Sequence, residues 1–203
     1  VITVIAMGMT FVILGGGFDL SVGSVVALSG CVGAAVMMKG GIIFGIAAGV
    51  GAGALVGLAN GVAVTVLRVN PFIATLGTMV LVRGVVFLIT NGEQVPVDGV
   101  MPKSFLDFGV ERLLGIHYLV WVPAVLLVLL SWVLAMTPYG RSVYATGGNR
   151  EAAYLSGIRV DRVIASTYVW CGAMAGLAGM MLASRLQSGQ PTAGEFYELT
   201  AIA

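Results

Sequence analysis

The sequence predicts an all-α protein, a polytopic bundle of transmembrane helices with about six membrane segments. Of its 203 residues, 59% are hydrophobic and only 9% are charged, whereas an ordinary soluble domain carries roughly 25% charged residues. The mean hydropathy is +1.04. Residues 40–67, 113–140 and 163–184 contain no Asp, Glu, Lys or Arg, and each run exceeds the roughly 20 residues with which a helix crosses a bilayer.

Six apolar segments follow one another along the chain: 1–14, 22–38, 41–67, 72–90, 118–136 and 163–182. The tail 183–203 is polar until Leu199, where a new apolar stretch begins. Because the chain opens on Val1 rather than Met, we expect a fragment with spans missing at both ends. We interpret residues 1–203 as a single transmembrane domain.

Positive charge predicts the orientation of the segments. The loop 137–162 carries Arg141, Arg150, Arg159 and Arg162, whereas the loop 91–117 carries only Lys103 and Arg112 as cations. An excess of Lys and Arg marks the cytoplasmic side, so we place 137–162 inside and 91–117 outside. Arg68, in the inner turn 68–71, agrees with this placement, and Lys39, in an outer turn, is an exception.

Glycine recurs at every fourth position of the third segment, at 41, 45, 49, 53, 57 and 61. Small residues let helix backbones approach closely, and such packing drives association inside a membrane. A four-residue step drifts by about 40° from the 3.6-residue turn, so the glycines wind around the helix and contact more than one neighbour. We expect this segment inside the bundle rather than against lipid.

Two short stretches of the sequence match in residue type. Residues 18–22 read Phe-Asp-Leu-Ser-Val, and residues 197–201 read Tyr-Glu-Leu-Thr-Ala. Each follows a membrane segment and a glycine-containing turn, and the predicted orientation gives the two preceding segments opposite directions. Related segments of opposite direction indicate an inverted repeat, which is common in transporters. The glycines at 15–17 further predict a broken helix near 15–21.

Polar residues within or between the apolar segments are candidates for a path through the membrane. Asp19 lies where a charge is costly unless it faces water or a partner. Asp19 and Ser21 can either cap the helix 22–38 or contact a transported molecule, and Glu198 has the same two interpretations.

Arg83 lies inside the fourth segment, eight residues before Asn91, which places it roughly 12 Å from the outer end. The Arg83 side chain can hardly reach the membrane surface over that distance by snorkelling. We therefore expect Arg83 to pair with another group or to face a water-filled cavity. Asn60 and Thr75, in neighbouring segments, either line such a cavity or join helices by hydrogen bonds.

The sequence lacks the usual motifs for metal binding, nucleotide binding and catalysis, which argues against several classes of protein. The single histidine, His117, has no second ligand at metal spacing, and no G-x-x-x-x-G-K-[ST] phosphate loop occurs. Ser29 lacks the base that an intramembrane serine protease requires. The net charge of +1 gives no reason to expect nucleic acid as a partner. We therefore predict no catalytic residue, no metal site and no cofactor in this chain.

Residues 147–158 form a predicted short helix in the inner loop. Asn149 can cap its start, Glu151 suits the positive N-terminal end, and Gly157 can terminate it. A two-turn helix with an apolar edge at Leu155 and Ile158 is marginal alone. We expect it to dock against another protein, and a helix lying on the lipid surface is the alternative.

The stretch Glu151-Ala152-Ala153 followed by Gly157 resembles the EAA loop of ABC importer permeases, in which a short coupling helix fits a cleft in the ATPase. Further stretches, in the same order as in the family, are similar to ribose/xylose/arabinose-type ABC permeases: 16–24, 70–78, 147–149, 184–185 and 194–200. Phe18 departs from the aliphatic residue that the family favours after Gly-Gly, and the family's later spans are absent.

The resemblance implies a multi-pass, non-enzymatic permease subunit in the bacterial inner membrane that imports a monosaccharide of pentose or hexose type. It implies a periplasmic sugar-binding protein, a second permease copy, membrane lipid and a cytoplasmic ATPase that binds ATP and Mg as partners. The ATPase would contact the coupling loop 137–162 through Asn149, Glu151, Ala152, Ala153, Leu155 and Gly157. The candidate path residues are Asp19, Ser21, Asn60, Thr75, Arg83 and Glu198.

Three other interpretations are open at this point. An ABC permease of the same superfamily can carry branched-chain amino acids or a signalling furanone. A proton-coupled secondary transporter would work without an ATPase. An intramembrane protease would need a base that the sequence lacks.

Overall fold

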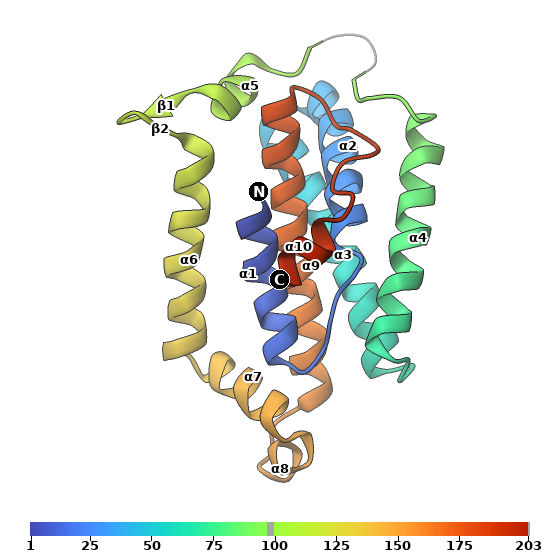
Figure 1. The fold of residues 1–203 in the computed structure, drawn as a ribbon, viewed down its shortest axis with the longest axis vertical. Coiled ribbons are helices and arrows are strands. Elements are labelled where there is room, and N and C mark those ends of the chain that lie inside the picture. Colours follow the sequence, from blue (N-terminus) through green and yellow to red (C-terminus); the bar gives the residue numbers. More distant parts are fainter. Residues whose placement is uncertain (97–99, 203) are drawn as a thin grey trace.

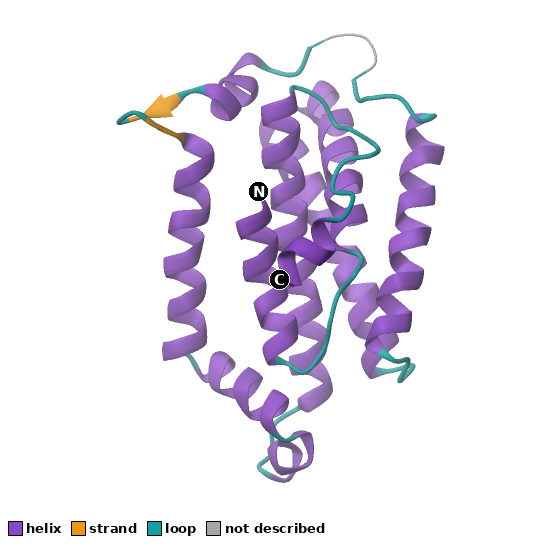
Figure 2. Ribbon diagram, in the orientation of Figure 1, coloured by secondary structure: helices purple, strands orange, loops and turns teal. Residues whose placement is uncertain are grey.

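The computed structural model describes residues 1–96 and 100–202, and their fold is a bundle of helices with one small hairpin (Figure 2). This confirms the predicted all-α polytopic bundle. Helices α2, α3, α4, α6 and α9 are long and apolar enough to cross a membrane, and α1 is a shorter apolar helix of 13 residues. The elements are α1 (Ile2–Leu14), α2 (Val22–Gly40), α3 (Ile42–Thr65), α4 (Pro71–Thr90), α5 (Lys103–Val110), β1 (Arg112–Leu113), β2 (Ile116–His117), α6 (Tyr118–Met136), α7 (Pro138–Gly148), α8 (Arg150–Leu155), α9 (Val160–Leu186) and α10 (Tyr197–Ile202).

The predicted segments agree with the helices except at a few ends. Helix α9 extends three residues before and four residues after the predicted 163–182, because the helix continues through polar residues that end the apolar run. Helix α7 was not predicted as a separate element. It begins at Pro138, whose fixed φ suits a first helical position, and the Thr137 hydroxyl caps it by accepting the Gly140 N–H at 3.2 Å.

The two ends of the bundle differ as the charge distribution predicts. Figure 1 shows α7, α8 and the turn between α3 and α4 at one end, and α5 with the β1–β2 hairpin at the other. These are the loops that the arginines assign to the inside and the outside, respectively. Residues 97–99 of the outer loop lie outside the described residues.

Helix α9 lies at the centre of the bundle and packs against α1, α2 and α3, while α4 and α6 lie at the periphery (Figure 1). The core joins these helices through fully buried side chains such as Phe11, Val26 and Tyr168. Helix α4 packs mainly against α2, and α6 touches α1, α5 and α7. The central group therefore forms the scaffold, and the outer helices pack onto it.

The glycines of α3 change neighbour along the helix, as their four-residue spacing predicts. A β-carbon on Gly45 would meet Met37 of α2, whereas one on Gly57 would meet the Tyr168 carbonyl of α9. The expectation that the whole segment lies inside is wrong, because the glycines cover only one side. The opposite side is exposed, with Ile43 at 81% and Leu55 at 67% of their full accessibility.

Candidate functional site

The chain leaves helical structure twice within the bundle, at 15–21 and at 187–196. The first segment runs from the end of α1 back along the bundle to α2, and the second enters from the opposite end and leads to α10, roughly midway along the bundle (Figure 1). Gly16 and Gly194 adopt left-handed backbone conformations, with φ of +82° and +74°, which glycine adopts without strain. The predicted break near 15–21 is present.

The two non-helical segments converge at a pair of glycines. A β-carbon on Gly23, in the first turn of α2, would overlap the carbonyl oxygen of Gly194, and a β-carbon on Gly194 would overlap the carbonyl oxygen of Gly23. The backbones are thus in direct contact. The contact lies next to the two stretches whose sequences match, 18–22 and 197–201, because Gly23 directly follows the first and Gly194 shortly precedes the second.

Asp19, Ser21 and Asn60 lie together in the interior. The Asp19 carboxylate oxygen Oδ1 accepts the Ser21 backbone N–H at 2.9 Å, the Ser21 hydroxyl at 2.6 Å and the Asn60 amide Nδ2 at 3.3 Å. Asn60 Nδ2 also donates to the Ser21 hydroxyl oxygen at 2.9 Å. All three side chains are at most 1% exposed. This geometry fixes the 15–21 segment to α3. The predicted cap is wrong, because neither the Asp19 nor the Ser21 side chain caps the start of α2 and both bond to this cluster instead.

Thr75 does not join that cluster. Its side chain is buried, but its hydroxyl donates to the Pro71 carbonyl of its own helix at 2.9 Å. Such a bond within one helix neither joins two helices nor leaves the hydroxyl proton for a ligand. Among the described residues, Thr75 thus makes no hydrogen bond to the other candidate path residues.

Arg83 reaches the second non-helical segment. Its Nη1 donates to the Pro191 carbonyl at 2.7 Å and to the Ala193 carbonyl at 2.9 Å. It also lines a pocket of about 250 Å³ together with Ser24, Met79, Val80, Glu195, Phe196 and Glu198. Arg83 is thus hydrogen-bonded to backbone carbonyl groups and lines a pocket, and the expected wet cavity stays a prediction.

Five lining residues of this pocket were not among the predicted path residues: Ser24, Met79, Val80, Glu195 and Phe196. Glu195 and Phe196 reach Arg83 because the chain returns into the bundle after α9, whereas Ser24 comes from the first turn of α2. The match between 18–22 and 197–201 was the one available signal, since it marks the place where that return ends.

Helix α8 has the predicted ends. The Asn149 side chain accepts the Ala152 N–H at 3.0 Å, and Gly157 follows the helix with φ of +83°. Leu155 is 79% exposed and Glu151 and Ala152 are also exposed, whereas Ala153 is only 4% exposed. Ala153 packs inward and presents no surface of its own, because the two-turn helix rests on the protein through this side.

The α7–α8 unit contacts the first non-helical segment directly. A β-carbon on Gly147 would overlap the Leu14 carbonyl oxygen, and Arg150 Nη2 donates to the Gly16 carbonyl at 3.4 Å. From α9, the Tyr168 hydroxyl donates to the Phe18 carbonyl at 3.2 Å. Segment 15–21 is therefore held between the short helix α8 and the centre of the bundle.

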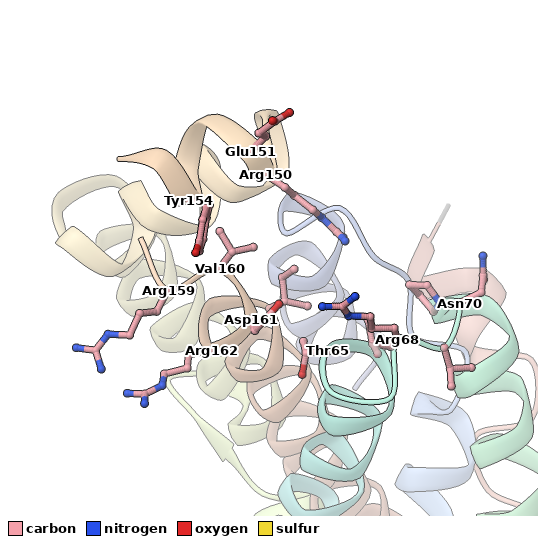
Figure 3. A pocket seen from close by; sticks show the side chains of 14 residues that line it. Thr65, Arg68, Asn70, Arg150, Glu151, Tyr154, Arg159, Val160, Asp161 and Arg162 are labelled. Atoms are coloured by element: carbon pink, nitrogen blue, oxygen red, sulfur yellow. The ribbon is translucent and has the colours of Figure 1, made fainter. Parts of the chain in front are cut away.

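A polar pocket of about 830 Å³ opens beside α8 (Figure 3). It lies between α8, the start of α9 and the α3–α4 turn. Its charged lining consists of Arg68, Arg150, Glu151, Arg159, Asp161 and Arg162. Figure 3 shows Arg68 pointing toward Asp161, while Arg159 and Arg162 point away from Arg68. The guanidinium groups thus do not converge on one point.

Across residues 1–96 and 100–202, no three His, Cys, Asp or Glu side chains are grouped closely enough to hold a metal ion. The two cysteines, Cys31 and Cys171, are both buried as free thiols, in keeping with their positions in apolar helices.

Comparison with known proteins gives one family. The family model described as branched-chain amino acid transport system / permease component matches residues 1–203. The ribose import permease protein RbsC of Escherichia coli (strain K12) is 43% identical over 202 residues, and that of Bacillus subtilis (strain 168) is 47% identical over 205 residues. The L-arabinose ABC transporter permease protein AraH of Azospirillum brasilense is 41% identical over 199 residues.

Each of these alignments covers 98% of this chain, but only 63%, 62% and 58%, respectively, of the relative. The chain therefore spans about three-fifths of the length of these relatives. No solved structure matches it significantly.

Proposed function

The chain belongs to the branched-chain amino acid transport system / permease component family, and from this membership we propose that it is the membrane-spanning subunit of an ATP-driven monosaccharide importer in the bacterial inner membrane. The relatives named above are permeases for ribose import and for L-arabinose. A pentose-type sugar is accordingly the substrate class that these similarities support.

The observation that carries the proposal is the exposed face of α8. Leu155 and Tyr154 are 79% and 71% exposed at the arginine-rich end of the bundle, and an apolar edge on a two-turn helix is more stable against a partner than in water. We assign this face to a cytoplasmic ATPase, which supplies the ATP and Mg site that this sequence lacks. The polar pocket beside α8 adds charged groups at the rim of the same surface.

Movement of α8 has a direct route into the bundle. The contacts of Gly147 with Leu14 and of Arg150 with Gly16 join the α7–α8 unit to segment 15–21. Asp19 then connects this segment to α3, and Gly23 connects the start of α2 to Gly194. ATP-driven closure of the partner would shift the equilibrium between outward-open and inward-open states through these contacts.

The remaining partners follow from the same proposal. A periplasmic binding protein delivers the sugar at the outer end, which α5 and the hairpin form, and a second permease copy completes the path through the membrane. Affinity resides in the binding protein, so the path itself needs only weak polar contacts. Asp19, Ser21 and Asn60 support the path by fixing the chain, while Arg83 and Glu198 line the pocket near its centre.

The test of the proposal compares the same substitution at the two ends of the full-length protein. Leu155→Asp should abolish co-purification of the ATPase encoded with it, because a charge would replace the most exposed apolar contact of α8. Leu114→Asp is the matched control, since Leu114 is 86% exposed in the hairpin at the opposite end, and it should leave co-purification unchanged.

Co-purification that persists with Leu155→Asp would refute the assignment of α8. Sugar uptake by the wild-type chain without any ATPase would instead favour a secondary transporter. The family description also names branched-chain amino acids, so uptake of leucine rather than a pentose by the complete complex would change the substrate class.

A further inference from the structure

The pocket around Arg83 gathers three charged side chains at a depth where charge is unusual. It lies where segment 187–196 passes into α10, roughly midway between the two ends of the bundle (Figure 1). Arg83 comes from α4, and Glu195 and Glu198 come from the returning segment and α10. Charges at the centre of a bilayer are costly and normally face a partner or a water-filled cavity.

The exposure of the pocket's residues argues against a sealed ion-pair cluster. Glu195 is exposed, and Phe196 is 70% exposed beside it. Lipid would leave the Glu195 carboxylate without solvation, which favours an aqueous path over lipid at this opening. The pocket volume of about 250 Å³ lies just below the range of roughly 300–1,000 Å³ for small-molecule sites, which suits a compact ligand.

The polar groups of the pocket have unused hydrogen-bonding capacity. Both bonds of Arg83 use Nη1, so Nε and Nη2 have no partner among the described residues. Neither carboxylate has a hydrogen-bond donor within the described part of the chain. A guanidinium donates only and a carboxylate accepts only, so together they can bind hydroxyl groups, which do both.

The charge balance and the aromatic side chain narrow the ligand class further. Two carboxylates and one guanidinium give the pocket a net charge of −1, which disfavours an anionic ligand. Phe196 offers an apolar ring to the C–H face of a sugar, in the way that binding pockets combine an apolar wall with a few placed polar groups.

From these observations we infer that the Arg83–Glu195–Glu198 pocket is a monosaccharide-contact site on the translocation path, selective for neutral over phosphorylated sugars. The inference rests on the proposed importer function and extends it to Glu195 and Phe196. The site is coupled to the crossing of the two non-helical segments, because the Glu198 carboxylate lies only 2.6 Å from where a Gly23 β-carbon would be. A movement at that crossing would reach the pocket directly.

The experiment uses a cysteine that removes no polar group. Val80 lines the pocket and is exposed, so Val80→Cys in the full-length protein, assembled with its ATPase in nanodiscs, should react with a water-soluble thiol reagent. The native cysteines are buried and give a low background. D-ribose or L-arabinose should slow the reaction at least threefold, and ribose 5-phosphate should not.

Two further variants separate binding from mere access. Glu195→Gln with Glu198→Gln, in the Val80→Cys protein, should keep the labelling and lose the protection by sugar. Leu88→Cys, on the same helix outside the pocket and 79% exposed, is the control whose labelling should not respond to sugar.

Each contrary result overturns the inference. Absence of labelling at Val80→Cys would place the pocket against lipid or protein. Labelling without protection, equal protection by ribose 5-phosphate, or protection that survives in the double glutamine variant would remove the sugar site. Because the readout needs neither ATP nor uptake, protection without uptake by the complete transporter would reject the importer and keep the site, whereas uptake without protection would do the reverse.

Discussion

A β-carbon on Gly23 would overlap the carbonyl oxygen of Gly194, and a β-carbon on Gly194 would overlap the carbonyl oxygen of Gly23. This mutual contact joins the start of α2 to the segment that precedes α10. It is the point where the two interruptions of helical structure meet, so its tolerance to substitution tests the central feature of the fold.

Gly23→Ala should lower the free energy of unfolding by about 1–3 kcal/mol, because the new methyl group forces the backbone of segment 187–196 to shift. Thermal unfolding in detergent measures this. Gly84→Ala is the matched control, since no atom lies within 4 Å of its added β-carbon, and it should be neutral or stabilising by up to about 1 kcal/mol. Equal stability of the two variants would contradict the contact.

The glycines of α3 allow a sharper comparison within one helix. Gly57→Ala places a methyl group on the Tyr168 carbonyl of α9, whereas Gly51→Ala meets nothing within 4 Å. We expect a loss of about 1–3 kcal/mol for the first substitution and no loss for the second. Chemical denaturation in mixed micelles would give both values, and a similar loss for Gly51→Ala would mean that helix flexibility, not packing, explains the glycines.

Asn60→Ala should be more harmful than Asp19→Asn. The alanine removes the donor to both Asp19 and Ser21 and leaves buried acceptors without it, at a cost of about 1–3 kcal/mol. The asparagine keeps an oxygen for the Ser21 N–H and hydroxyl, so a loss below about 1 kcal/mol is expected. Unfolding of the single and double variants should be non-additive, and additive losses would separate Asp19 from Asn60.

Arg83→Ala should release residues 190–194. The guanidinium holds two carbonyls of this segment, and hydrogen bonds to charged groups contribute about 1.5–3 kcal/mol. Hydrogen–deuterium exchange should rise at least tenfold in this peptide, and Arg83→Lys should give an intermediate rise because it keeps the charge with one nitrogen. Arg112→Ala, in the exposed hairpin, should leave the exchange of 190–194 unchanged.

Arg150→Ala tests the connection between α8 and segment 15–21. Removing the bond to the Gly16 carbonyl should leave ATPase binding intact and lower the sugar imported per ATP hydrolysed by several-fold. Arg141→Ala, an exposed arginine of α7, is the control for loss of positive charge at this end. An unchanged ratio in the Arg150 variant would exclude this contact from coupling.

Local features were readable from the sequence because their causes lie within a few residues. The apolar runs predict the long helices, the four-residue glycine spacing predicts the change of neighbour along α3, and Asn149 and Gly157 predict the ends of α8. The charge difference between the loops predicts which elements share an end of the bundle.

The remaining features depend on chain segments that are distant in sequence. Arg83 donates to carbonyl groups 108 and 110 residues away. These contacts arise because the chain turns back into the bundle after α9, and no local sequence pattern predicts that turn. For the same reason the sequence-based prediction omitted Glu195. Glu198 was predicted as a path residue and lines the pocket, and its role on a path stays a prediction. The burial of Ala153 was also missed, since a six-residue helix is too short for its sequence to show which side faces the protein.

The glycine contact between α3 and α9 has a consequence for how the molecule can move. Helices that touch through backbone atoms have no side-chain rotamers to adjust between them, so α3 and α9 cannot slide without losing the contacts at Gly53, Gly57 and Gly61. We therefore expect α3 and α9 to move together as one rigid unit in every state of the proposed transport cycle. We expect deformation in α4 and α6 instead, because their contacts with the bundle include side chains. Substitutions there should change the rate of the proposed transport cycle rather than the stability of the fold.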